Sequence, residues 1–596
     1  MNDIIYPQVP TCRISTSNSP SKSTTDYLAF ALAGRTKEQS SAQKPTCQQD
    51  LWLTVFFDGT GNNREVDEPT FEHSNVVRLY HAHHIDDPVS DRYRLYVPGI
   101  GTPFREIGDE GGKFSMAVGA GGEARIQWAL GRVEARIKAA AARANNQANK
   151  IRSINIAVFG FSRGAATARA FARRIADRCA EVGERWEWKE GRHPTRLYFL
   201  GLFDTVASVG LPASARKFGG EAFLLGFLPV LIAANADGHG GWAENLRVPP
   251  MVERCVHYCS AHEMRNSFPL DTLLEDGVYP ENCFEHFYPG VHSNVGGGYR
   301  PGEGGRNTNR FAMLNLIPLK AMYEEAIKAG VPLVDINTAD DQIKDDFLPP
   351  PGEATEARKR LSEHFDYYMN TVGWGGNNVG ETVRRHMQMY FRWRIQHVQR
   401  KMEERQKGGA DWETQRLVQY DSELETERRE KQEELRRRER EYRAAQSERD
   451  RVRTEADQGY WRADADEVHA RYEEKRWAKV HQEAVVNTMP ANADQLAAAL
   501  DKYDQQFLQD SKAVLAADPS TLRPFARILR EAWEMERLTD KTIIAFFDEY
   551  VTDSLAGFDT DRTRAIEHRW LYQGGDATID YAALRRMELE RLAEVA

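Results

Sequence analysis

Residues 154–171 read Ile154-Asn-Ile-Ala-Val-Phe-Gly-Phe-Ser-Arg-Gly-Ala-Ala-Thr-Ala-Arg-Ala-Phe171, a strand pattern that runs directly into a helix pattern. Ile154 to Phe159 is a short β-branched and apolar run, typical of a strand buried on both faces of a parallel sheet. Residues 165–180 are rich in alanine and contain neither glycine nor proline, which predicts a helix. A buried strand followed at once by a helix is a building unit of α/β folds.

The connection between strand and helix is Gly160-Phe-Ser-Arg-Gly164, which matches G-x-S-x-G in the context that this motif requires. A serine hydroxyl is a poor nucleophile, so it must be presented on a sharp turn, open to a histidine and to a substrate carbonyl. The glycines give such a turn room, and the helix N-terminus directs N–H groups toward a developing oxyanion. Ser162 is therefore the predicted nucleophile, and an ordinary glycine-rich turn is the alternative.

Strand and helix patterns alternate on both sides of this motif. Residues 51–57, 92–97 and 196–203 have strand patterns, and 123–148 has a helical one. This alternation predicts right-handed crossovers and a mostly parallel sheet. The loop Asp58-Gly-Thr-Gly-Asn-Asn63 follows the first strand, at the carboxyl edge where open α/β sheets hold their sites.

An acid and a base follow the serine along the chain. Asp204 ends the strand 196–203, where the order Ser, Asp, His of α/β-hydrolases puts the acid, although it could instead cap a helix. His286 and His292 are the candidates for the base. We favour His292, because it lies just past the end of a strand-like run and before a glycine cluster. It would take the proton of Ser162, while Asp204 would fix its tautomer.

Four sequence blocks together resemble the α/β-hydrolase domain of type VI secretion lipase effectors of the type-1 group. The blocks are Phe56-Phe-Asp-Gly-Thr-Gly-Asn-Asn63, Gly160-Phe-Ser-Arg-Gly-Ala165, Gly201-Leu-Phe-Asp-Thr-Val-Ala-Ser-Val-Gly210 and Pro289-Gly-Val-His-Ser-Asn-Val-Gly-Gly-Gly-Tyr299. The resemblance implies a triad of Ser162, Asp204 and His292 and a phospholipase A activity on bacterial glycerophospholipids. It also implies an antibacterial effector that a type VI spike or adaptor protein carries into the periplasm of a rival cell, and a cognate immunity protein.

The oxyanion of the proposed chemistry needs two backbone donors. We expect the N–H of Arg163 and one from the loop beside it, that of Gly59. No metal or organic cofactor is required. The sequence Cys255-Val-His-Tyr-Cys259 is expected to be a buried strand rather than a metal site, because its side chains alternate and lack zinc-ligand spacing.

The resemblance covers about residues 50–345 and returns near Phe546 to Phe558, which suggests an insertion into one hydrolase domain. Thr552 stands where the family often has histidine. The expected division is a flexible arm (1–49), the catalytic core (50–345), a helical insertion for membrane or partner binding (346–520) and a C-terminal segment that returns to the core (521–596).

The predicted insertion is dominated by charged residues between Val398 and Val480, which favours long helices linked by i,i+4 ion pairs, such as a coiled hairpin. Before it lies Arg384-Arg-His-Met-Gln-Met-Tyr-Phe-Arg-Trp-Arg394, a basic and aromatic segment that could rest on an anionic membrane. Residues 222–234 form the most hydrophobic stretch and are expected to be either core, the interpretation we prefer, or a lid.

The 596-residue chain carries a formal net charge of −10, which gives no global reason to expect a nucleic-acid partner. Its N-terminus lacks the pattern of a signal peptide, and no run reaches the roughly 18 apolar residues of a spanning helix. We therefore expect synthesis in the cytoplasm, and the resemblance to type VI effectors implies secretion by that system. The alternatives are a soluble carboxylesterase or thioesterase, and a non-catalytic scaffold that binds partners through its charged helices.

Overall fold

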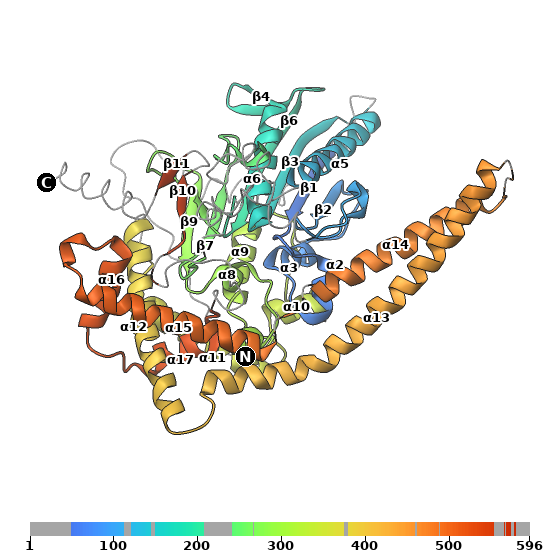
Figure 1. Ribbon diagram of the computed structural model, residues 1–596. Coiled ribbons are helices and arrows are strands. Elements are labelled where there is room, and N and C mark those ends of the chain that lie inside the picture. The colour runs from blue at the N-terminus through green and yellow to red at the C-terminus, as the bar shows by residue number, and fades with distance from the viewer. Residues whose placement is uncertain are drawn as a thin grey trace.

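The computed structural model describes residues 49–112, 121–144, 150–207, 241–265, 268–374, 379–458, 460, 462–487, 489–490, 492–553, 566, 568–573 and 577–579. A central sheet lies between layers of helices, and a group of longer helices lies below it in the view of Figure 1. The predicted N-terminal arm, apart from Gln49, and the hydrophobic stretch 222–234 lie outside the described residues.

Within the described residues, six parallel strands lie side by side in the central sheet. They are β2 (Arg92–Val97), β1 (Gln49–Phe57), β3 (Ile151–Phe161), β6 (His193–Phe203), β7 (Cys255–Ser260) and β9 (Cys283–Tyr288), in this spatial order. A hairpin of β4 (Cys179–Val182) and β5 (Arg185–Trp188) pairs antiparallel with the start of β6. The prediction of a mixed α/β fold with a mostly parallel sheet is confirmed.

The central strands are buried on both faces because helices cover each face. Ile156 and Val158 of β3 belong to the cluster beneath α5 (Gly122–Arg143) and α6 (Arg163–Asp177). Ala157 and Phe159 point to the opposite cluster. On that face the sheet packs against α3 (Asn75–Ala82) and α9 (Leu316–Ala329).

The predicted helix 165–180 was wrong at its end. The helix α6 ends at Asp177, and Cys179 already belongs to β4, where it pairs with Trp188 of β5. Alanine-rich sequence favours a helix locally, but these residues pair with a strand that lies beside β6. Tertiary pairing therefore overrides the local preference.

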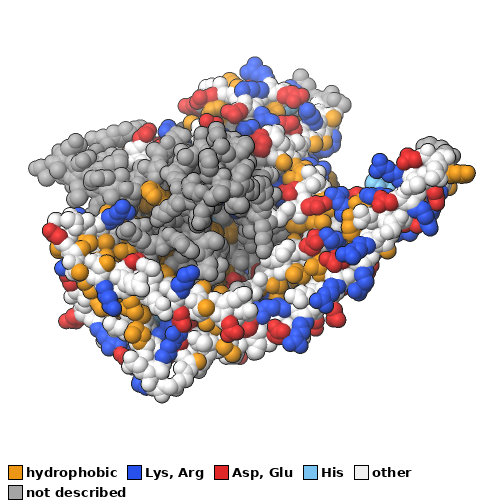
Figure 2. Space-filling model, viewed as in Figure 1, with side chains coloured by type: hydrophobic (Ala, Val, Ile, Leu, Met, Phe, Trp, Pro, Cys, Tyr) orange, Lys and Arg blue, Asp and Glu red, His pale blue; other side chains and the backbone are white. Residues whose placement is uncertain are grey.

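A group of helices follows the central sheet in the chain; it contains the longest described helices and is called the long helices. They are α11 (Glu353–Val372), α12 (Val379–Gln406), α13 (Trp412–Asp457), α14 (Ala465–Asn487), α15 (Ala493–Ala516), α16 (Pro524–Glu534) and α17 (Lys541–Tyr550). α13 and α14 pack together as an antiparallel hairpin that projects from the body as an arm (Figure 1). Side chains of both charge signs lie along this arm (Figure 2), and Arg437 pairs with Glu434 and Glu441 one turn away on either side.

The basic and aromatic segment expected at a membrane lies on α12. Its rings are buried, since Tyr390, Phe391 and Trp393 are 6%, 0% and 3% exposed. Arg384 and Arg385 both donate to Glu381 at 2.8 Å. These aromatic side chains therefore belong to the protein core rather than to a membrane-facing surface. Among helices of the described residues, none combines the length and apolar character needed to cross a bilayer.

Candidate active site

Ser162 lies between the end of β3 and the start of α6 with φ 58° and ψ −130°. A residue with a side chain rarely adopts this conformation, and the surrounding backbone maintains it. The Ser162 N–H donates to the Phe203 carbonyl at 3.0 Å, and the Val206 N–H donates to the Ser162 carbonyl at 3.2 Å. The serine is thus presented on the sharp turn that its motif predicts.

Both glycines of the motif are required by close packing. A Cβ on Gly160 would lie 2.6 Å from the Gly164 carbonyl oxygen, and one on Gly164 would lie 2.2 Å from the Asp58 carbonyl oxygen. Either side chain would force the backbone apart. The second contact brings the loop after β1 directly against the start of α6.

Asp204 and His292 are brought together at the carboxyl edge of the sheet. Asp204 directly follows β6, and His292 is the first residue of α8 (His292–Gly296). The distance between Asp204 Oδ2 and His292 Nδ1 is 2.6 Å. His286, the other candidate base, lies within β9 and packs its ring against Tyr258.

Phe161, the residue before Ser162, packs its ring against the imidazole of His292. Its ring centroid lies 4.6 Å from that of His292, and the Phe268 ring packs on the imidazole at 4.9 Å. Among the hydrogen bonds of the described residues, none joins Ser162 Oγ to His292. Such bonds are often long or poorly aligned in ligand-free enzymes and tighten when substrate binds.

Asp204 is held by more donors than a triad needs. The Ser260 N–H donates at 2.7 Å and the Ser260 hydroxyl at 3.1 Å. The buried Arg569 donates through both terminal nitrogens, Nη1 to Oδ2 at 2.7 Å and Nη2 to Oδ1 at 2.6 Å. Burial alone would raise the pKa of Asp204, but Arg569 and His292 hold it well below its usual range. Sequence analysis missed Arg569, which lies 365 positions from Asp204.

A second buried carboxylate supports the histidine from its backbone side. Glu263 Oε2 accepts the His292 N–H at 3.1 Å, and Arg265 holds Glu263 with two bonds at 2.8 Å. Although burial opposes ionisation, Arg265 and Arg569 lower the pKa of Glu263 to about 2. Burial also keeps the pKa of His292 below its ordinary value, against the opposite effect of Asp204. The imidazole is therefore neutral near pH 7 and able to accept a proton.

The glycine loop offers the second predicted oxyanion donor. Its Gly59 N–H donates to Asp58 Oδ1 at 2.8 Å, and burial raises the pKa of Asp58 to about 6. Arg163 Nε donates to Thr60 Oγ1 at 2.7 Å, which ties the loop to the start of α6. Within the described part of the chain, the Arg163 N–H has no hydrogen-bond acceptor, whereas the Gly59 N–H is already engaged.

The part of the chain that carries this site matches a known protein family. Residues 52–180 and 180–325 match the model of the T6SS phospholipase effector Tle1-like catalytic domain. Residues 52–325, here called the Tle1-like domain, are therefore similar to that catalytic domain. The resemblance to type VI secretion lipase effectors is thereby confirmed.

Comparison with solved structures gives information on the fold. The chain is similar to an uncharacterized protein from Pseudomonas aeruginosa, with a TM-score of 0.59 and 22% identity over 93% of this chain and 82% of that one. This likeness shows a shared fold. A Tle1 effector bound to the VgrG spike of the type 6 secretion system matches with a TM-score of 0.36 and 18% identity, over 56% of this chain and 82% of that one. A comparison with curated proteins finds no match.

Among the described residues, two clusters of side chains of the types that bind metals lie within and beside the Tle1-like domain. In the first, Glu285 accepts from His257 at 2.8 Å, and it also accepts from Tyr279 and from the Leu273 N–H. Its oxygens are therefore engaged, and the strand Cys255–Ser260 is buried as predicted. In the second, formed by His397, Glu413 and Asp504, the cation between the carboxylates is the ammonium of Lys401.

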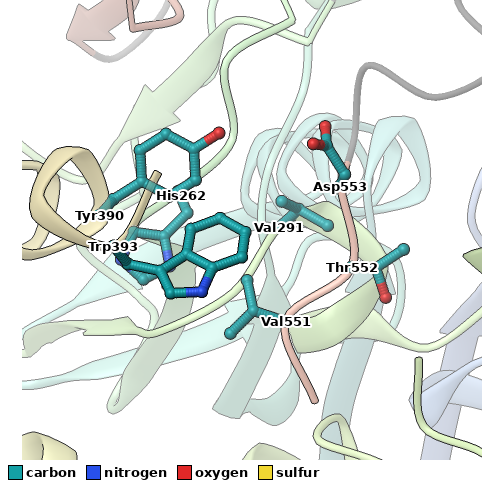
Figure 3. Close-up of a pocket in the computed structure, with 7 residues that line it drawn as sticks. All are labelled: His262, Val291, Tyr390, Trp393, Val551, Thr552 and Asp553. Carbon is teal, nitrogen blue, oxygen red and sulfur yellow. The ribbon is translucent and has the colours of Figure 1, made fainter. Parts of the chain in front are cut away.

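A cavity of about 10 Å³, room for about one water, lies beside residues 289–292 of the Tle1-like domain, called the histidine loop because it ends at His292. Tyr390 and Trp393 of α12 lie on one side of it and the segment Val551, Thr552 and Asp553 on the other, with Val291 between them (Figure 3). The remaining lining residue is His262.

His262 joins the histidine loop to the long helices. The Gly290 N–H donates to His262 Nδ1 at 2.9 Å, so the other ring nitrogen carries the proton. That nitrogen lies 3.1 Å from the Tyr368 hydroxyl on α11, which in turn lies 2.9 Å from His386 Nδ1 on α12. Burial keeps the pKa of His262 well below its ordinary value. The chain of bonds therefore consists of neutral groups.

Proposed function

We propose that the protein is a serine phospholipase of the A type, with Ser162 as nucleophile, His292 as general base and Asp204 as its acidic partner. The observation that carries this proposal is the 2.6 Å contact between Asp204 Oδ2 and His292 Nδ1, beside a serine on a strained turn. The Tle1-like family supports a lipid ester as substrate. The mostly parallel sheet and the order of the three residues support an α/β-hydrolase fold.

The first half of the reaction forms an acyl-enzyme. His292 Nε2 takes the proton of Ser162 as the hydroxyl oxygen bonds to the ester carbonyl carbon. Asp204 stabilises the resulting imidazolium through Nδ1. When the tetrahedral intermediate collapses, the ester C–O bond breaks, and the leaving glycerol oxygen takes the proton from His292. In the second half, His292 takes a proton from a water whose oxygen bonds to the acyl carbon. The bond between that carbon and Ser162 Oγ then breaks, Ser162 regains the proton from His292, and the fatty acid is released.

The negative charge on the carbonyl oxygen is stabilised by two backbone donors. The Arg163 N–H at the start of α6 is the first, since it has no acceptor within the described residues and the helix dipole adds to its effect. Gly59 supplies the second when its N–H exchanges the Asp58 carboxylate for the oxyanion. The bond from Arg163 to Thr60 ties the loop that carries Gly59 to the start of α6.

The similarity to the effector family supports a biological setting for this activity. We propose delivery by a type VI spike or adaptor protein, action on glycerophospholipids in the periplasm of a target bacterium, and a cognate immunity protein in the producer. Residues 50–345 and 521–596 would form the catalytic unit. The helical region 346–520 would bind a partner or a membrane, and α13 and α14 are its most projecting part (Figure 1).

The test uses fluorogenic phospholipids labelled at sn-1 or at sn-2, beside short p-nitrophenyl esters. Wild type is compared with Ser162→Ala and with Ser153→Ala, a control near the opposite end of β3. Phospholipid hydrolysis that only Ser162→Ala abolishes supports the proposal. Hydrolysis of short esters alone would identify a soluble esterase. Release from neither substrate, or release that survives Ser162→Ala, would favour a scaffold.

A further inference from the structure

The guanidinium of Arg569 forms two parallel bonds to the carboxylate of Asp204, at 2.7 and 2.6 Å. Both side chains are completely buried. Bidentate pairing of this kind fixes the plane of the carboxylate as well as its position. Arg569 Nη2 also donates to the Ser260 carbonyl at 3.0 Å. The same nitrogen therefore binds both Asp204 and Ser260, and Ser260 itself donates to Asp204.

The segment that carries Arg569 is held on the Tle1-like domain by backbone hydrogen bonds, in addition to the pair between Arg569 and Asp204. β10 (Leu571–Gln573) pairs in parallel with β8 (Leu270–Thr272). The Leu270 N–H donates to the Trp570 carbonyl at 2.8 Å, next to Arg569 in the chain. The pairing of β10 with β8 therefore fixes the position of the Arg569 guanidinium beside Asp204.

The charges around the imidazole of His292 balance when Arg569 is present. Asp204 and Glu263 contribute two negative charges, and Arg265 and Arg569 contribute two positive ones. Among the described residues, the other titratable groups that face this cluster are the thiol of Cys259, the imidazole of His568 and the phenol of Tyr299, all of them uncharged near neutral pH. Without Arg569 the cluster would carry a net negative charge, which would favour the protonated imidazole.

We infer that Arg569 is a positioning residue for the proposed triad, which orients Asp204 and, by balancing its charge, keeps His292 unprotonated in mildly acidic solution. This inference depends on the proposed function. An uncompensated carboxylate raises the affinity of a neighbouring imidazole for protons. Arg569 weakens that effect, so the base stays available at lower pH, while the Asp204 to His292 bond is retained.

The experiment measures kcat and KM between pH 4.5 and 8.5 on a fluorogenic phospholipid for wild type and Arg569→Gln. We expect the acidic limb of kcat/KM to move up by about one pH unit, because neutralising a paired arginine shifts neighbouring groups by about that much. We also expect kcat to fall about tenfold or more, with KM within about twofold, since the change affects orientation of the base rather than substrate binding. An acidic limb that coincides with that of wild type would overturn the inference.

Arg394→Gln is the matched control. Arg394 is, like Arg569, a buried and ion-paired arginine, but its partners are the carboxylates of Asp504 and Asp553, and none of its contacts within the described residues is with Asp204. It should lose stability without moving the acidic limb. An equal shift in both variants would show a general effect of lost buried charge and would contradict the inference.

If Arg569→Gln does not fold, Arg569→Lys carries the test. Lysine keeps the charge but loses the parallel pair of bonds, so kcat should fall about threefold or more while the acidic limb stays within about 0.3 pH unit of wild type. A fully active Arg569→Lys would overturn the positioning role. Ser162→Ala separates the two proposals. If hydrolysis does not depend on Ser162, both proposals fail. If it does, and the acidic limb of Arg569→Gln coincides with that of wild type, only the role of Arg569 is excluded.

Discussion

Phe161 packs its ring 4.6 Å from the imidazole of His292, so the residue before the proposed nucleophile touches the proposed base. The Phe161 ring also lies close to Gly296, which is on the same short helix, α8, as His292. A Cβ on Gly296 would lie 1.9 Å from Phe161 Cε2. The serine turn and the histidine loop are therefore coupled by one aromatic ring, which packs closely against Gly296 and His292.

Replacing Gly296 with alanine should displace Phe161 and, through it, the imidazole. We expect kcat to fall by about tenfold or more, because small displacements of a positioned base have large effects on rate. The melting temperature should also fall, since the added methyl overpacks the core. Gly131→Ala is the control: it lies on the exposed face of α5 with no atom within 4 Å of an added Cβ. That variant should keep full activity and gain a little stability.

Tyr368 is the central group of the bonds that join the histidine loop to the long helices. Tyr368→Phe would leave the protonated nitrogen of His262 and the Nδ1 of His386 without their partner. We expect unfolding in urea to show a loss of about 2 kcal/mol, the usual cost of unsatisfied buried polar groups. Tyr367→Phe removes a hydroxyl from the neighbouring residue, which is 45% exposed, and should change stability by less than about 0.5 kcal/mol. Equal losses in the two variants would contradict the importance of the buried bonds.

Glu263 should make the protein sensitive to acid. Its pKa is about 2 in the folded protein against an ordinary value of 4.5, so its contribution to stability is complete above pH 4.5 and is lost as the pH falls toward 2. The size of that contribution is on the order of 3 kcal/mol. Urea unfolding at several pH values between 7 and 3 should therefore show wild type and Glu263→Gln converging toward low pH.

The control for this titration is Glu244→Gln, which neutralises an exposed carboxylate. Its stability curve should run parallel to that of wild type over the whole range. Curves of wild type and Glu263→Gln that stay equally far apart from pH 7 to 3 would exclude Glu263 as the acid-sensitive group.

Lys401 joins three of the long helices through buried ion pairs. From α12, its ammonium lies 2.8 Å from Glu413 on α13 and 2.9 Å from Asp504 on α15. Lys401→Met would leave buried carboxylates without this partner, at a cost of about 3 kcal/mol in the free energy of unfolding. Lys328→Met, which removes an ammonium that is 62% exposed, should cost less than about 1 kcal/mol. A neutral Lys401→Met would indicate that the network is not needed to hold these helices together.

Much of the catalytic core could be predicted because its signals are local. The strand pattern before Ser162, the glycines around it and the helix after it are adjacent in the chain, and the structure has this succession over residues 151–177. Asp204 and His292 could be chosen because each follows the end of a strand, and the ends of parallel strands meet at one edge of a sheet. Their role in catalysis stays a prediction.

Other features depended on partners distant in the chain. The aromatic residues of α12 suggested a membrane surface, but α12 packs against α16 and α17, and their side chains bury these rings. The strand at Cys179 formed because Trp188 pairs with it, against an alanine-rich helical pattern.

The local order of residues, through strand and helix periodicity and glycine-permitted turns, determined the parallel sheet and the turn that carries Ser162. Only the tertiary structure decided that Arg569 balances Asp204 and that Glu263 supports His292. Neither contact has a signature in the residues around it, because a buried charge can be matched by any oppositely charged group that folding brings near. The pairing of β10 with β8, 300 positions away, is what brings Arg569 to the site.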